Sequence, residues 1–237
     1  MELEQRAAWL LRERRKRLMG MTRYTHLLFD LDGTLTDPKE GITRSVQYAL
    51  RRMGIEEPDL DKLTPFIGPP LQVSLRERYG FTPEQAWEAI GWYREYFTER
   101  GMFQNEMYPG IPQLLAELGA EGRKLIIATS KPIVFAKQIL AHFGLDRHFA
   151  HLAGSELDGT RSDKADVIAY ALELAGFPPV SACLMIGDRK HDIEGARAHG
   201  MDCAAVAYGY GTAEELRLAQ PAYTAATVHS LAELLRG

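Results

Sequence analysis

From residue 124 to the C-terminus, short apolar runs alternate with segments of helical spacing, and this alternation limits the folds that the chain can adopt. The apolar runs predict strands at 125–128, 149–152, 183–186, 203–206 and 223–227. The segments between and after them predict helices at 132–143, 164–175, 192–199 and 231–235. Strands that are apolar throughout are buried on both faces, so the pattern indicates a parallel sheet with helices on either side.

The stretch between residues 37 and 107 follows a different pattern. It has helical periodicity at 42–53, 71–79 and 83–100 and no convincing strand, whereas the apolar run Leu27-Leu28-Phe29 before it is typical of a strand. The sequence therefore predicts an α/β fold: a doubly wound, mainly parallel Rossmann-like sheet with an α-helical insertion after its first strand. We assign residues 23–36 and 108–237 to the core and 37–107 to the insertion.

Residues 1–22 form a separate basic segment. Its first twenty residues carry six basic and three acidic side chains, a net charge of +3, and leucines recur at nearly helical spacing. A basic amphipathic helix would suit a partner or an acidic surface. We favour the simpler interpretation that the working protein begins near Met19 or Met21, because the first strand follows almost directly.

Bulk composition argues against several classes of protein. A net charge of −4 and a pI of about 6.0 do not suit nucleic-acid binding. No apolar run reaches the ~18 residues that a membrane-spanning helix needs. Cys183 and Cys203 both lie in apolar runs, which predicts two buried, reduced thiols in a cytoplasmic protein.

Two aspartates, Asp30 and Asp32, directly follow the first apolar run. On a strand, residues two apart share a face, and two carboxylates on one face repel each other unless a cation or a proton lies between them. Such a placement indicates a nucleophile, a proton donor and acceptor, and a metal. A calcium-binding loop is the alternative for an Asp-x-Asp-Gly segment, but no glutamate stands at the twelfth position, where such a loop needs one.

Three further polar segments follow predicted strands or begin predicted helices. Thr129 and Ser130 suit an anion at a helix start, although an ordinary N-cap explains them equally well. Asp188 and Asp192 lie four residues apart and would complete an oxygen-ligand site of the kind that Mg²⁺ prefers. Lys164 lies where the helix dipole favours acids, which a bound phosphate would explain. In a doubly wound sheet, ligands bind at this edge, outside the carboxyl ends of the strands.

The order of these segments resembles that of the haloacid dehalogenase-like superfamily, in particular its phosphatases with a helical cap inserted after the first motif. The resemblance covers roughly residues 24 to 236 and rests on Asp30-Leu31-Asp32-Gly33-Thr34 and on Gly187-Asp188 with Asp192. It implies a Mg²⁺-dependent phosphoric monoester hydrolase that acts on a small phosphorylated metabolite. It also implies that residues 37–107 are the cap.

The resemblance assigns roles to single residues. Asp30 would be the nucleophile that forms an aspartyl-phosphate. Asp32 would be the acid that protonates the leaving oxygen and then the base that activates water. The phosphate-binding residues would be Thr129, Ser130, Lys164 and Gly33. The ligands of Mg²⁺ would be Asp30, the carbonyl oxygen of Asp32, Asp188 and, directly or through another ligand, Asp192.

The identity of the substrate depends on the cap. Residues 66–71 resemble the cap loop of phosphoglycolate phosphatase-like proteins, although Gly68-Pro69-Pro70 stands where many of them have Gly-x-Gly. Arg44 would pair with a substrate carboxylate or second phosphate if it faces the site, and is otherwise a solvated helix residue. A 5′-nucleotidase, a sugar phosphomutase and a regulatory binding protein on the same fold are the alternatives. We expect a monomer or a homodimer.

Overall fold

The computed structural model describes residues 21–236. The basic N-terminal segment, with its predicted helix, lies almost entirely outside these residues. Within the described part of the chain, no helix combines the length and the apolar composition that crossing a membrane requires. Cys183 and Cys203 are buried free thiols, as the sequence predicts.

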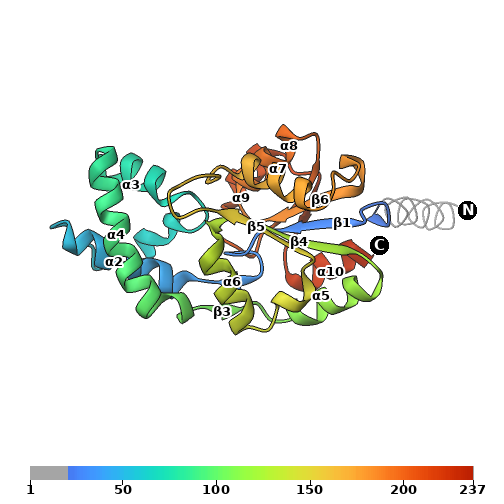
Figure 1. Ribbon diagram of the computed structural model, residues 1–237, viewed down its shortest axis with the longest axis horizontal. Helices are drawn as coiled ribbons and strands as arrows, with labels where there is room; N and C mark the ends of the chain where they lie inside the picture. The colour runs from blue at the N-terminus through green and yellow to red at the C-terminus, as the bar shows by residue number, and fades with distance from the viewer. Residues whose placement is uncertain (1–20, 237) are drawn as a thin grey trace, which may run out of the picture.

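Six parallel strands form the central sheet (Figure 1). The strand β1 is central, since Phe29 is in register with Ile127 of β4 and with Ile186 of β6. Strands from three distant parts of the chain therefore end side by side, and the predicted fold class is confirmed. The full order is β5 (His151–Ser155), β4 (Lys124–Pro132), β1 (His26–Phe29), β6 (Cys183–Gly187), β7 (Asp202–Val206) and β8 (Tyr223–Ala225).

Helices cover both faces of the sheet because alternate strand residues are apolar on both sides. Leu27 and Phe29 belong to one hydrophobic cluster and Leu28 to the other. The helices α7 and α8 lie on one side of the sheet in Figure 1, and α5, α6 and α10 lie on the opposite side. Their bounds are α5 Ile111–Ala120, α6 Ile133–His142, α7 Lys164–Leu174, α8 Lys190–Ala198 and α10 Val228–Arg236; the short α9 (Ala213–Ala219) was not predicted.

The segment between β1 and α5 folds into helices that group beside one end of the core (Figure 1). In α4, Pro83 occupies the first turn, and Thr82 and Gln85 form a reciprocal capping box, which explains its start. The elements are α2 (Lys39–Arg52), η1 (Leu60–Phe66), α3 (Leu71–Tyr79), α4 (Pro83–Glu99) and η2 (Gly101–Phe103).

Two local expectations are wrong. A short antiparallel pair, β2 (Thr36–Asp37) and β3 (Glu106–Met107), brackets the insertion although no strand was expected there, because two-residue strands have no detectable periodicity. The strand β4 continues to Pro132, so Thr129 and Ser130 extend a strand rather than begin a helix. The short helical turns η3 (Asp146–His148) and η4 (Val180–Ala182) complete the described elements.

Candidate active site

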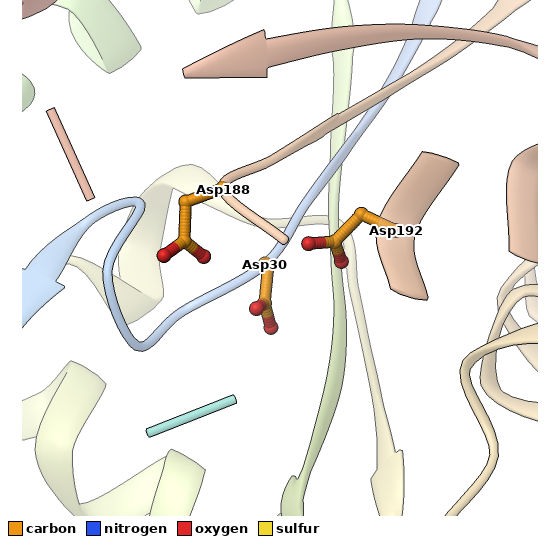
Figure 2. Close-up of side chains that lie close together, drawn as sticks. All are labelled: Asp30, Asp188 and Asp192. Carbon is orange, nitrogen blue, oxygen red and sulfur yellow. The ribbon is translucent and has the colours of Figure 1, made fainter. Parts of the chain in front are cut away.

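The carboxyl ends of β1 and β6 bring the two predicted aspartate motifs together. Asp30 follows β1, and its N–H donates to the carbonyl of Ile186 in β6 at 2.9 Å. Asp188 follows β6, while Asp192 lies in the first turn of α8 and accepts from the N–H of Arg189 at 3.0 Å. Oxygens of Asp30, Asp188 and Asp192, one from each carboxylate, all lie within 4.8 Å of one another (Figure 2).

The three carboxylates are almost completely removed from solvent. Asp30 is 4% exposed, and Asp188 and Asp192 are 0% exposed. Burial raises the pKa of Asp188 well above its usual value, and the charges of Asp192 and Asp30 raise it further. Burial also raises the pKa of Asp192 to about 6, against the opposing effect of Lys164. Such a cluster is unfavourable without compensating positive charge.

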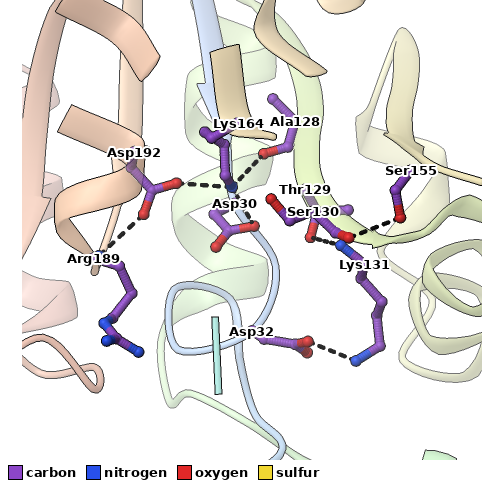
Figure 3. Close-up of polar contacts among 10 residues, drawn as sticks. All are labelled: Asp30, Asp32, Ala128, Thr129, Ser130, Lys131, Ser155, Lys164, Arg189 and Asp192. Atoms are coloured by element: carbon purple, nitrogen blue, oxygen red, sulfur yellow. Dashed lines mark hydrogen bonds and ion pairs between the residues drawn. The ribbon is translucent and has the colours of Figure 1, made fainter. Parts of the chain in front are cut away.

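Lys164 supplies part of that charge. Its Nζ lies 3.0 Å from Asp30 and 2.8 Å from Asp192, and donates to the carbonyl of Ala128 at 3.0 Å (Figure 3). Although burial opposes the ammonium charge, Asp192 and Asp30 raise the pKa of Lys164 above its usual value. Oδ1 of Asp188 is buried and has no hydrogen-bond partner within residues 21–236. Three carboxylates, one ammonium and an unpaired buried oxygen suit a divalent cation.

The carboxylate of Asp32 points away from this cluster. Its Oδ2 lies 2.6 Å from Nζ of Lys131, and both side chains are buried (Figure 3). Burial raises the pKa of Asp32, while Lys131 opposes the shift. The carboxylates close enough to share a metal ion are those of Asp30, Asp188 and Asp192. If Asp32 contributes to a metal site, it would do so through its backbone carbonyl. Nothing in the sequence alone placed Lys131 opposite Asp32.

The other predicted phosphate-binding residues border the same sheet edge. Thr129 is buried, and its Oγ1 accepts from the backbone N–H two residues further on at 3.2 Å. The carbonyl of Ser130 accepts from the hydroxyl of Ser155 at 2.8 Å. The N–H of Gly33 donates to the carbonyl of Thr36 at 2.7 Å, so the turn after β1 already uses this donor. Gly33 therefore shapes the turn.

Glycines fix the position of Asp188. Gly33 has a φ of +82°, and a Cβ there would lie 2.3 Å from Oδ2 of Asp188. A Cβ on Gly209 would lie 2.4 Å from the Cβ of Asp188, and the N–H of Tyr210 donates to Oδ2 at 2.6 Å. The sequence did not indicate a role for this loop. The signal that could have found it was the pair of glycines at 209 and 211, shortly after the strand β7, but their contact with Asp188 is visible only in the fold.

A cleft opens beside Asp32 between the core and the inserted helices. The helices contribute aromatic and aliphatic side chains, and the core contributes Asp32 and the polar residues of β4 and β5. Phe97 stacks on Tyr93 with ring centroids 5.3 Å apart. The lining includes Asp32, Phe66, Trp87, Tyr93, Arg94, Phe97, Ser130, Lys131, Phe135 and Ser155.

The predicted cap loop, residues 66–71, borders this cleft and is fastened to the core. Arg189 donates through its guanidinium to the carbonyl of Ile67. The same guanidinium is oriented by Glu215, whose Oε1 lies 2.9 Å from Nε. A Cβ on Gly68 would lie 2.9 Å from Cγ of Arg189, so the loop passes close to the arginine stem. Arg189 thus ties the loop to the segment that carries Asp188.

Arg44 does not reach the cleft. It is exposed on α2, and its Nε lies 2.9 Å from Oε1 of Glu40, one turn earlier in the same helix. Of the two interpretations that the sequence left open, this placement agrees with a solvated helix residue. We therefore assign Arg44 no part in binding substrate.

Comparison with known proteins places this arrangement in a family. The family model of haloacid dehalogenase-like hydrolases matches residues 27–206. The chain belongs to this family. The 5′-nucleotidase of Pseudomonas aeruginosa is 52% identical, with 90% of this chain and 96% of that protein covered. The tyrosine-protein kinase PtkA of Mycobacterium tuberculosis is 42% identical over 88% of this chain and 72% of the kinase.

A solved structure supports the same assignment. A predicted phosphatase from Clostridium acetobutylicum is 47% identical, with a TM-score of 0.87 over 89% of this chain and 97% of that one. More distant relatives include phosphoglycolate phosphatases. The predicted family and the phosphoric monoester hydrolase class are confirmed.

Proposed function

We propose that this hydrolase is a Mg²⁺-dependent phosphatase that works through an aspartyl-phosphate on Asp30. The observation that carries the proposal is the contact set of Asp30: Lys164 lies 3.0 Å away, and the carboxylates of Asp188 and Asp192 lie within metal-bridging distance. Phosphoryl transfer depends mainly on positioning and on charge neutralisation. A carboxylate held beside the ammonium of Lys164 meets both requirements.

The residues support a two-step reaction. A carboxylate oxygen of Asp30 attacks phosphorus, the bond from phosphorus to the leaving oxygen breaks, and Asp32 gives that oxygen its proton. Water then attacks the aspartyl-phosphate while Asp32 takes a proton from the water, which releases phosphate and restores Asp30. Lys164 stabilises the negative charge on Asp30 and on the phosphoryl group throughout. Thr129 and Ser130 border the position of the phosphoryl oxygens.

The carboxylates of Asp30 and Asp188, the carbonyl of Asp32 and, directly or through another ligand, Asp192 would hold the Mg²⁺. When bound, the ion supplies positive charge to the phosphoryl oxygens. An all-oxygen donor set suits Mg²⁺ better than it suits softer metals. The described carboxylates and the unpaired Oδ1 of Asp188 fit such an ion.

We further propose that the inserted helices act as a cap and that the substrates are nucleoside 5′-monophosphates. The cleft beside Asp32 is lined by Phe66, Trp87, Tyr93 and Phe97, which suit a planar base. The 52% identical relative is named a 5′-nucleotidase. Phosphoglycolate has only a small carboxylate and no ring that could stack on these side chains. Arg44, which could have paired with that carboxylate, lies outside the cleft. This reverses the order of preference that the cap loop sequence suggested.

A substrate panel tests both parts of the proposal. We expect phosphate release from AMP to require Mg²⁺, to exceed release from phosphoglycolate and from glucose phosphates, and to disappear in Asp30→Asn. Turnover retained in Asp30→Asn would refute the aspartyl-phosphate mechanism. A preference for phosphoglycolate would refute only the substrate class. Isomerisation of a sugar phosphate faster than phosphate release would instead identify a mutase, and absence of turnover throughout the panel would favour a binding protein.

A further inference from the structure

The ion pair between Lys131 and Asp32 differs from the pairs in the carboxylate cluster. It joins two side chains that are only 6% and 10% exposed, and it lies at the cleft rather than among the cluster carboxylates. Lys164 serves Asp30 and Asp192, whereas Lys131 pairs with Asp32. The two reacting carboxylates, Asp30 and Asp32, therefore pair with different lysines.

The pair uses one oxygen of Asp32 and leaves the other available. Oδ2 accepts the hydrogen bond from Lys131 at 2.6 Å. Oδ1 is buried and has no hydrogen-bond partner among the described residues. A buried carboxylate oxygen without a hydrogen-bond partner is unfavourable. We therefore expect Oδ1 to gain a partner when substrate binds. The leaving oxygen of a phosphoester is such a group.

Lys131 is itself held by both parts of the molecule. Its backbone N–H donates to Oγ1 of Thr129 in β4 at 3.2 Å. Its ammonium lies 4.9 Å from the ring centroid of Phe97 in α4. That ring is fixed by stacking on Tyr93 and by an edge contact with Phe135, with both centroids 5.3 Å away. A cation over a buried aromatic face is stabilised there, so the ammonium has a defined position.

We propose that Lys131 is a positioning residue that fixes the carboxylate of Asp32 so that Oδ1 meets the leaving oxygen. The proposal rests on the function proposed above for Asp32. Lys131 does not touch the reacting atoms. It holds Oδ2 of Asp32. Because its ammonium contacts the ring of Phe97, the position of the carboxylate depends on how the inserted helices pack on the core. In the first step, which kcat/KM reports, a residue with this role matters only when the leaving oxygen needs a proton.

Substrates with different leaving groups separate this role from a structural one. Phenyl phosphate has a leaving oxygen that needs a proton, whereas 2,4-dinitrophenyl phosphate has a similar ring and leaves without one. General acid catalysis contributes about 10²–10⁴-fold. We expect Lys131→Met to lower kcat/KM about 30-fold or more for phenyl phosphate and at most about threefold for 2,4-dinitrophenyl phosphate. Lys131→Arg, which keeps the cation, should recover part of the loss.

Two further variants make every outcome informative. Asp32→Asn is the reference variant: its loss in kcat/KM should depend on the leaving group in the same way and be larger than that of Lys131→Met. Phe97→Leu should show the same dependence with a smaller loss. Circular dichroism and the midpoint of thermal unfolding establish that the variants are folded; if Lys131→Met does not fold, Lys131→Arg and Phe97→Leu carry the test. Equal losses on both substrates, or no loss, would overturn the role of Lys131. Failure of Asp32→Asn to show the dependence would instead overturn the proposed function of Asp32.

Discussion

The sheet edge and the adjoining cleft place polar groups by different means. At the edge, Asp30 and Asp188 follow parallel strands that end side by side, and the glycine backbone packs against the carboxylate of Asp188. In the cleft, Lys131 lies between the core and rings contributed by another part of the chain. The proposed reaction chemistry therefore lies where the strand ends converge. The proposed substrate selection lies in the cleft, where side chains of the core and of the inserted helices meet.

The largest effect is expected at the sheet edge from Asp188→Asn. Losing this carboxylate removes one proposed Mg²⁺ ligand, and even groups that only support metal ligands are worth about 10–100-fold. We expect phosphate release to fall by more than about 100-fold. Mg²⁺ should also raise the midpoint of thermal unfolding of the wild-type protein, because it relieves repulsion among buried carboxylates. The corresponding shift in Asp188→Asn should be much smaller.

An Asp188→Asn protein that keeps both its activity and its response to Mg²⁺ would contradict the metal site. Ca²⁺ at the same concentration is a useful comparison, because it prefers more ligands and longer bonds. A gain in thermal stability without activity in Ca²⁺ would separate binding at the edge from the chemistry performed there.

The next effect concerns the glycine backbone around Asp188. A Cβ on Gly209 would lie 2.4 Å from the Cβ of Asp188, so Gly209→Ala must displace one of the two. Since a misplacement of ~1 Å costs about 10²-fold in rate, we expect a loss of about that size in kcat for AMP.

Gly91→Ala is the matched control in the inserted helices. Gly91 is exposed within α4, and a Cβ there meets no atom within 4 Å. The substitution should leave kcat unchanged and stabilise the protein by about 0.5–1 kcal/mol in chemical denaturation, because alanine favours a helix. Similar kinetic losses in both glycine variants would contradict the distinction between the two regions.

The same contrast explains what the sequence could predict. Asp30 and Asp188 were brought together in the prediction because the carboxyl ends of parallel strands must share an edge, so their positions along the chain suffice. Lys164 was singled out because a cation at a helix start opposes the helix dipole. Lys131 and Gly209 were missed because their roles depend on a partner: the carboxylate of Asp32 in one case and that of Asp188 in the other. Gly33 was assigned to phosphate, but its N–H is used within its own turn.

For the inserted helices, the sequence predicted the bounds of the elements better than the contacts of their side chains. The bounds of α3 were predicted correctly, and α4 differed by one residue at its end, because apolar spacing and caps are local signals. Which side chains of these helices face the core depends on how the insertion docks, and no local signal records that. Arg44 was singled out for its charge, whereas Trp87 and Tyr93 were overlooked although they line the cleft.

A smaller, substrate-dependent effect is expected from Trp87→Ala. Trp87 lines the cleft, and across it a Cβ on Gly159 would lie 3.4 Å from the indole ring. Stacking of a base on an aromatic side chain is worth about 1–3 kcal/mol, so kcat/KM for AMP should fall about tenfold. Phosphoglycolate has no ring and should be affected less than about twofold. An equal loss for both substrates would remove Trp87 from recognition of the base.

The smallest effect is expected from Arg44→Ala, which tests whether charge alone marks a substrate contact. Arg44 is exposed and its guanidinium pairs with Glu40 on the outer surface of α2. Ion pairs of this kind in helices are worth only about 0.3–0.5 kcal/mol, so the unfolding free energy should change by no more than that. We expect kcat/KM for AMP and for phosphoglycolate to stay within about twofold of wild type. A loss confined to phosphoglycolate would show that Arg44 reaches substrate after the inserted helices move, and substrate choice would then depend on that movement as well as on the rings of the cleft.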